Sequence, residues 1–141
     1  MAKMTDDERR RLLAEGTRTG MLATVRKDGR PHVAPVWFVL DGEDLVFTTG
    51  AESVKGHAIR RDPRVAICVD REESLYDFVI VEGRATISED PNELLRWATV
   101  IAARYMGADK AEAYGKRNAV PGELLVRVTP TKIAAEKDIA A

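Results

Sequence analysis

The first segment of the chain has the pattern of a helix rather than a strand. Thr5 and Glu8 have the spacing of a capping box, in which each side chain bonds the backbone N–H of the other residue. Leu12 and Leu13 supply a small apolar face, and Gly16 is a typical residue for ending a helix. We therefore expect a short N-terminal helix that packs on the rest of the molecule through its leucines.

Between residues 17 and 50 the pattern changes to three apolar runs joined by turn signals. Asp28-Gly29 and Asp41-Gly42 each offer the positive φ of a tight hairpin turn, so the three runs predict an antiparallel meander. The middle run, HVAPVWFVL, is apolar at both alternating sets of positions, so we expect both of its faces to be covered. Pro35 has no N–H to donate, which predicts a sheet edge or a bulge there.

The rest of the chain alternates between further strands and helices. Asp90 is a typical N-cap with Pro91 at the first helical position, so a helix begins there, and its apolar stripe extends to about Met106. Gly83 interrupts an apolar run and predicts a β-bulge. The other expected elements are short helices at 52–61 and 109–118 and strands at 64–70, 76–89 and 122–138.

About six strands and few helices predict a mainly β fold, in which a small antiparallel barrel closes its own edges. The 141 residues suit a single domain spanning 1–141, and the 45% apolar content supports a core. The net charge of −1 gives no general attraction to nucleic acid or anionic membranes. The charged start lacks a signal-peptide pattern, and no apolar run approaches the roughly 20 residues that cross a bilayer. We expect a cytoplasmic protein without nucleic-acid or membrane partners.

One stretch, TTGAESVKGHAIRRDPR at 48–64, gathers hydroxyl and basic side chains around a glycine-containing turn at the start of an expected helix. Hydroxyls, backbone N–H groups and positive charge at such a place can bind a phosphate, although the residue order of a Walker loop is missing. A capped, solvated helix explains the same residues, and composition alone favours that second interpretation. The residues concerned are Thr48, Thr49, Ser53, Lys55, Arg60 and Arg61.

The other chemistry-bearing residues show no catalytic pattern. His32 and His57 are the only histidines, and they lack carboxylate or cysteine partners at ligand spacing, so no metal site is expected. Cys68 lies in an apolar run and is expected to be a buried hydrophobe. Neither a serine elbow nor a cysteine–histidine pattern is present. If the chain is an enzyme, we therefore expect a bound cofactor to supply the chemistry.

Three segments, taken together, resemble a known family. They are GMLATVRKDGRPHVAPVWFVLDG, LVFTTG followed by SVKGHAIRRDPRVAICVD, and FVIVEGRATI, and they resemble the pyridoxamine-phosphate-oxidase-like split-barrel family over residues 17–88. The branch they resemble most is that of the actinobacterial deazaflavin-dependent oxidoreductases, which use coenzyme F420. The resemblance implies a six-stranded antiparallel split β-barrel of the FMN-binding type. It also implies a homodimer with a cofactor site in each of the two grooves between the subunits.

By this resemblance, the strand containing HVAPVW lies along the planar ring of the cofactor, and the end of the next strand lines the site. The following turn would hold the phosphate, and aromatic residues would reach in from the partner subunit. The residues of this expected site are, in that order, His32, Val33, Ala34, Pro35 and Val36; Phe47, Thr48 and Thr49; Ser53 and Lys55 with Arg60 and Arg61 nearby; and Tyr76 and Phe78. The resemblance thus favours phosphate binding over the solvated helix.

The family divides by cofactor. Members that use FMN, including the oxidase itself, carry an arginine-rich second strand, whereas VAPVWFVL has no arginine. This difference argues against pyridoxamine phosphate as substrate and favours coenzyme F420, with FMN as the alternative. The expected reaction is hydride transfer from the reduced deazaflavin to a small-molecule electron acceptor, such as an enone, a quinone or a coumarin- or tetrapyrrole-like compound, with no proton donor identified. A non-catalytic protein that stores or shields a cofactor or tetrapyrrole is a third hypothesis.

Overall fold

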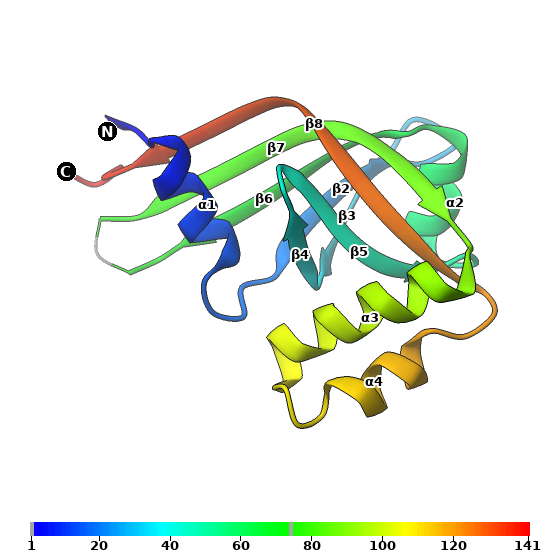
Figure 1. Cartoon of the computed structure of the whole chain (residues 1–141). Coiled ribbons are helices and arrows are strands. Elements are labelled where there is room, and N and C mark those ends of the chain that lie inside the picture. Colours follow the sequence, from blue (N-terminus) through cyan, green and yellow to red (C-terminus); the bar gives the residue numbers. More distant parts are fainter. Residues whose placement is uncertain (1, 74) are drawn as a thin grey trace.

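The computed structural model describes residues 2–73 and 75–141, and this part of the chain forms eight strands and four helices (Figure 1). It confirms the predicted mainly β fold with flanking helices. The strands are β1 (Ala2–Lys3), β2 (Gly20–Val25), β3 (Pro31–Val36), β4 (Phe38–Asp41), β5 (Asp44–Gly50), β6 (Arg64–Arg71), β7 (Asp77–Ser88) and β8 (Glu123–Lys137). The helices are α1 (Asp6–Ala14), α2 (Val54–Arg61), α3 (Pro91–Met106) and α4 (Ala111–Asn118).

The strands form one curled antiparallel sheet in the order β3-β2-β6-β7-β8-β5-β4, with β1 added beside β8. The long strands β7 and β8 curve across the whole molecule (Figure 1). Their pairing shifts register between Glu82 and Gly83, which confirms the predicted irregularity. A Cβ atom at Gly83 would lie only 2.6 Å from the carbonyl oxygen of Thr129, so a side chain there would push the two strands apart.

The middle apolar run forms two strands, so the predicted meander is wrong at this point. β3 pairs with β2, and β4 pairs with β5, which places the two strands at opposite edges of the sheet. Pro35 lies in the edge strand β3, as its missing N–H predicts. Trp37 is the single residue between the two strands, and no pairing joins β3 to β4 within the described residues. The barrel is therefore split rather than closed.

Two apolar cores lie on opposite faces of the sheet. The inner face of the curl holds the larger core, which α1 completes with Leu12 and Leu13. The second core lies on the outer face of β4, β5 and β8, where Trp97 and Ile101 of α3 pack on Val46 and Leu125. α4 packs beside α3 (Figure 1). Helix α3 thus covers only one half of the outer face.

The other half of the outer face, formed by β3, β2, β6 and β7, is apolar and partly exposed. We call it the uncovered face. Strand register places its residues side by side: Met21 lies opposite Pro35 on one side and Cys68 on the other, and Cys68 lies opposite Ile80. Val33 is 59% exposed on this face. Cys68, expected to be buried, is only partly so, and burial raises the pKa of its thiol.

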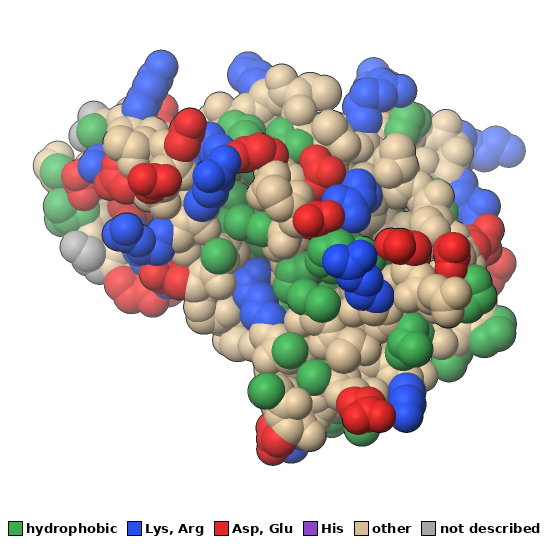
Figure 2. Space-filling model, in the orientation of Figure 1, with side chains coloured by type: hydrophobic (Ala, Val, Ile, Leu, Met, Phe, Trp, Pro, Cys, Tyr) green, Lys and Arg blue, Asp and Glu red, His purple; other side chains and the backbone are tan. Residues whose placement is uncertain are grey.

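Charged residues are distributed without strong segregation. Figure 2 shows acidic and basic side chains intermingled over one face of the molecule, with hydrophobic patches between them. In the described residues no helix is both long and apolar enough to cross a membrane.

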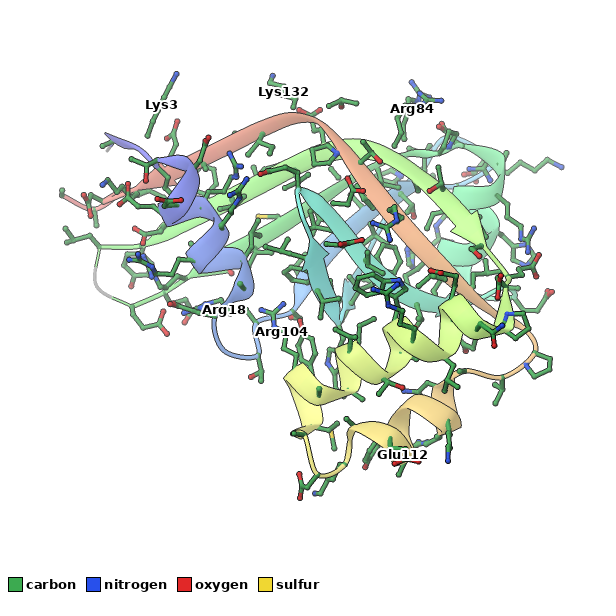
Figure 3. All side chains as sticks on the ribbon, in the orientation of Figure 1. Lys3, Arg18, Arg84, Arg104, Glu112 and Lys132 are labelled. Atoms are coloured by element: carbon green, nitrogen blue, oxygen red, sulfur yellow. The ribbon has the colours of Figure 1, made fainter. Side chains whose placement is uncertain are left out.

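Arg104 at the end of α3 ties the helices to the sheet. Its guanidinium donates hydrogen bonds to the carbonyl oxygens of Leu13 at 2.8 Å, Gly16 at 3.0 Å and Phe38 at 2.7 Å (Figure 3). Two of these acceptors belong to the C-terminal end of α1 and its continuation, where a positive charge is favoured by the unpaired carbonyls. One partly buried cation therefore fixes α1, α3 and the start of β4 together.

The capping box of α1 is present as predicted, and it is extended by a lysine. Glu8 accepts a hydrogen bond from the Thr5 N–H at 3.0 Å and one from Lys137 Nζ at 2.6 Å. The Lys137 hydrogen bond and then the Thr5 N–H lower the pKa of Glu8 from 4.5 to about 2. Because the unfolded chain binds this proton more readily, the stabilisation is fully present above about pH 4.5 and is lost as the pH falls through about 2.

We predict that Glu8→Gln lowers the melting temperature at neutral pH, because it removes the charge-assisted bond to Lys137. The difference in melting temperature from the wild type should shrink as the pH falls from about 4.5 towards about 2, where the wild type loses the same interaction. Thermal unfolding followed by circular dichroism across this range measures it. A difference that stays constant down to the lowest pH would contradict the assignment.

Candidate functional site

A cavity of about 370 Å³ lies where the end of β3, the end of β5, the first turn of α2 and the middle of α3 meet. Its size is in the range of small-molecule sites. The residues that line it are Pro35, Val36, Trp37, Thr48, Thr49, Gly50, Lys55, Ala98, Ile101, Asn118 and Glu123. The cavity lies at the border between the half of the outer face that α3 covers and the uncovered face.

The lining divides into an apolar and a polar part. The β3–β4 junction and α3 contribute apolar side chains, whereas the end of β5 and the start of α2 contribute two threonines and a lysine. Such a surface is suited to an amphiphilic ligand with an apolar ring at one end and an anionic group at the other.

The turn between β5 and α2 is built by Ser53, the N-cap of the helix. Ser53 Oγ donates to the carbonyl oxygen of Gly50 at 2.7 Å, accepts from the N–H of Gly56 at 3.0 Å, and lies 3.1 Å from Thr49 Oγ1. Its single proton is thus used within the turn, and its side chain does not line the cavity. Ser53 is predicted to bind the phosphate directly. In the described chain its hydroxyl instead bonds backbone groups and shapes the turn.

Gly56 lets the helix approach that turn closely. A Cβ atom at Gly56 would lie 2.3 Å from the carbonyl oxygen of Gly50, so no larger residue fits without moving the helix. The glycine in VKGHA, which is unfavourable within a helix by propensity, is therefore explained by packing. This packing places Lys55 of the first turn at the cavity.

Lys55 and Glu123 are the charged residues of the cavity lining. Among the residues that the structure describes, Lys55 has no ion pair within 4.0 Å and no side-chain hydrogen bond. Glu123, at the start of β8, is partly buried; burial raises the pKa of its carboxyl group, and the positive charge of Lys55 opposes that rise. Lys55 is therefore a cation that the described protein groups leave available for an anionic ligand.

Trp37 forms an aromatic wall of the cavity and is held from behind by Tyr105. The two rings are stacked, with centroids 4.9 Å apart and planes within 1° of parallel. The Tyr105 hydroxyl donates to the carbonyl oxygen of Arg18 at 2.7 Å and accepts from the N–H of Phe38 at 3.2 Å. Burial raises the pKa of Tyr105, so the hydroxyl stays protonated at neutral pH and keeps both hydrogen bonds.

Of the predicted site residues, the structure brings five together in the cavity lining. The predicted ring-contacting strand is divided, because successive residues of a strand point to opposite faces. His32 and Ala34 lie opposite Thr24 and Leu22, whose side chains face the inner core, whereas Val33 lies on the uncovered face. The five that line the cavity are Pro35, Val36, Thr48, Thr49 and Lys55.

Three further predicted residues are engaged elsewhere in the described chain. Phe47 has no exposed surface and belongs to the inner core, so its side chain cannot contact a ligand in the cavity. Arg60 forms an ion pair with Glu89 at 3.3 Å, and Arg61 donates to the carbonyl oxygen of Val25. Neither arginine lines the cavity, because both lie in the last turn of α2, away from its start.

The predicted aromatic contributors lie far from the cavity in the same chain. Tyr76 precedes β7 and Phe78 lies within it, and the start of β7 is at the end of the sheet opposite α2 (Figure 1). Tyr76 is 52% exposed, with φ +63°, and its carbonyl oxygen accepts from the N–H of Ile139 at 3.1 Å. Contact between either residue and a cavity ligand therefore needs a second copy of the chain.

The cavity also contains residues that the sequence did not single out for binding. Ala98 and Ile101 belong to the predicted apolar stripe of α3, which gave no hint that its edge would remain open. Glu123 offered a weak signal, since it is the acidic residue in the otherwise apolar run GELLV. Trp37 lay within a predicted continuous strand, and Asn118 ends α4; only tertiary packing brings these two to the cavity.

Comparison with protein families and solved structures places this sequence and fold in a known group. The sequence model of the family described as pyridoxamine 5'-phosphate oxidase matches residues 5–137. Among solved structures, the chain is similar to a protein named F420 reductase, with 32% identity and a TM-score of 0.69 over 87% of this chain and 94% of that chain.

Two other solved structures show the same architecture. A conserved hypothetical protein from Mycobacterium tuberculosis is 28% identical with a TM-score of 0.85, over 95% of this chain and 85% of that chain. A FAD-binding protein from Mesorhizobium loti is 22% identical with a TM-score of 0.68, over 94% of each chain. At this lower identity, the second similarity concerns the fold alone.

We predict that Tyr105→Phe destabilises the protein by about 1–3 kcal/mol, because it leaves the N–H of Phe38 and the carbonyl of Arg18 without their partner in a partly buried place. The near-ultraviolet circular dichroism of the stacked pair should change as well, because Trp37 loses its fixed support. Denaturant unfolding and the spectra measure the two effects.

The matched control is Tyr114→Phe on α4, where the tyrosine ring lies beneath Arg117. This substitution should change the free energy of unfolding by less than about 0.5 kcal/mol. Equal effects of the two substitutions would show that the Tyr105 hydroxyl does not hold the cavity wall.

Proposed function

The chain belongs to the pyridoxamine 5'-phosphate oxidase family, and from this premise we propose that it is an oxidoreductase that uses coenzyme F420. Its substrate would be an electrophilic small molecule such as an enone or a quinone. The observation that carries the proposal is the cavity that joins a lysine, which has no ion pair among the described residues, to an aromatic and aliphatic wall. The 32% identity to a protein named F420 reductase supports this cofactor over FMN, which is the alternative.

The cavity residues fit the parts of such a cofactor. Lys55, beside Thr48, would bind the phosphate, Thr49 would support the turn through its hydrogen bond with Ser53, and Pro35 and Trp37 would lie against the ring system. Bound there, reduced coenzyme F420 supplies a hydride to the acceptor. The absence of arginine from PHVAPV in β3 agrees with a site that does not hold pyridoxamine phosphate.

The protein's own contribution is positioning and exclusion of water. The turn fixed by Ser53 holds Lys55 at a constant place, and the apolar surface of Ile101 and Ala98 keeps water from one side of the cavity. Tyr105 does not act as proton donor to the acceptor, because its hydroxyl proton is bound to the backbone and its pKa is raised. The proton that accompanies hydride transfer would then come from solvent.

A direct assay tests the proposal. Purified protein is mixed with reduced coenzyme F420 and a panel of enones and quinones, and the oxidation of the cofactor is followed by its absorbance. Saturable cofactor binding with turnover of at least one acceptor is expected. A yellow preparation that releases FMN on denaturation would establish the alternative, and tight binding without turnover on any acceptor would favour a storage protein. The absence of any saturable binding would contradict all three.

We also propose that the functional unit is a homodimer formed through the uncovered face. This face is apolar at Met21, Val33 and Ile80, and it adjoins the cavity at Pro35. Phe78 lies on the same face and Tyr76 precedes it, so a second copy docked there would bring aromatic side chains towards the first copy's cavity. The site would then be completed by the partner subunit.

We predict that Lys55→Ala weakens cofactor binding by about 10- to 150-fold, which corresponds to the ~1.5–3 kcal/mol of a charge-assisted hydrogen bond. The melting temperature should not change appreciably, because Lys55 supports no other described side chain. Lys116→Ala on α4, whose amine pairs with Glu112 at 3.0 Å, is the matched control and should bind as the wild type does. Fluorescence titration of the cofactor gives the dissociation constants. Unchanged affinity of the Lys55 variant would show that this lysine is a solvated side chain that does not bind the cofactor.

We predict that Val33→Asp converts the dimer to a monomer, because it places a charge in the middle of the apolar face. Sedimentation velocity measures the species. Val120→Asp, at a valine that is 44% exposed in the connection before β8, is the control and should leave the dimer intact. A wild-type chain that sediments as a monomer at every concentration would contradict the proposed assembly.

A further inference from the structure

The cavity pairs its one cation with one carboxylate, which is unusual for a site that binds an anion. Lys55 comes from α2, and Glu123 comes from β8 on the other side of Gly50. The remaining lining residues are uncharged. The formal charge of the lining is therefore zero when both groups are ionised, in contrast to the several basic side chains of typical phosphate-binding sites.

The position of Glu123 follows from strand pairing. Glu123 lies opposite Gly50 in the β5–β8 register, and a Cβ atom at Gly50 would lie 3.8 Å from Glu123 Oε1. Since Gly50 has no side chain, the carboxylate stands directly beside the turn that precedes α2. No described group neutralises it by an ion pair within 4.0 Å.

Burial raises the pKa of Glu123, in agreement with a carboxylate that has lost part of its hydration, and Lys55 only partly offsets this. A second negative charge brought to the same turn would be repelled by Glu123 in a region of reduced dielectric constant. The strength of this repulsion depends on how many charges the incoming phosphate carries. A phosphate diester carries one negative charge, whereas a phosphate monoester carries about 1.5 to 2 at neutral pH.

We propose that Glu123 is a specificity residue that admits a singly charged phosphate diester beside Lys55 and disfavours a doubly charged phosphate monoester. Lys55 balances the first charge of the ligand, and Glu123 makes the second one costly. This inference rests on the proposed function, and it deepens it: coenzyme F420 joins its ring system to the rest of the molecule by a phosphate diester, whereas FMN ends in a phosphate monoester. Discrimination here comes from a repulsive group rather than from an additional attractive contact.

The test compares two ligands that differ in this one charge. FMN and its phosphate monomethyl ester share the ring and the ribityl chain, and coenzyme F420 is the reference ligand. Each is titrated into the full-length wild type and into Glu123→Gln, which keeps the size and hydrogen-bonding capacity of the side chain and removes its charge. Glu112→Gln, at a position that points away from the molecule on α4, is the control (Figure 3). Ligand fluorescence gives the dissociation constants.

In the wild type, the monomethyl ester should bind more tightly than FMN. Glu123→Gln should improve the affinity for FMN about tenfold more than that for the monomethyl ester, and Glu112→Gln should change neither. If the wild type binds coenzyme F420 but Glu123→Gln gains no preference for FMN relative to the ester, the inference is overturned while the proposed function stands. If neither protein binds coenzyme F420 saturably, the proposed function fails, and the inference falls with it.

Discussion

The close packing of the first turn of α2 on the backbone of Gly50 is the constraint on which the candidate site depends. Ser53 bonds both Gly50 and the N–H of Gly56, and Gly56 has no side chain that would hold the helix away. Lys55, which lies between Ser53 and Gly56, is thereby placed at the cavity. It forms no ion pair within the described residues. The N-cap of α2 thus places the positive charge of Lys55 beside the apolar wall of the cavity.

Much of the architecture could be predicted from local sequence patterns. The capping box at Thr5, the hairpin glycine Gly29 and the N-cap at Asp90 all lie where short-range rules put them, since each depends on neighbouring backbone groups alone. The break at Trp37 was not predictable in this way. Apolar residues on both faces are typical of a continuous buried strand, and they equally suit a segment that leaves one edge of the sheet to begin another.

The candidate site was only partly predictable, because local sequence patterns do not show which distant residues tertiary packing brings together. The threonines and Lys55 lie close together in sequence, so the turn signal made them candidates, and the resemblance to the family favoured phosphate binding there. Glu123 and Ile101 reach the cavity through strand pairing and helix packing, which no short-range pattern encodes. The resemblance implies that Phe47 lines the site with Thr48 and Thr49, whereas strand alternation turns the Phe47 ring into the inner core. The resemblance concerns segments of sequence, and it does not specify the direction of each side chain.

The two faces of the sheet explain why the site lies where it does. Helix α3 covers one half of the outer face, and Ala98 and Ile101 in its middle line the cavity together with Pro35, whereas the other half remains apolar and partly exposed. The cavity lies at this border. Helix α3 therefore encloses it on one side, whereas the side next to the uncovered face is open. A second subunit on the open side would complete the enclosure and exclude water, which is what hydride transfer requires.

The most direct test of this account is a crystal structure of the protein grown with coenzyme F420. We predict density for the phosphate within hydrogen-bonding distance of Lys55 Nζ, with the ring system against Pro35 and Trp37 and a second subunit covering its open side. The central claim is that the turn before α2 binds the anionic end of a redox cofactor. Density for the cofactor at another place, or a phosphate far from Lys55 Nζ in the dimer, would contradict it.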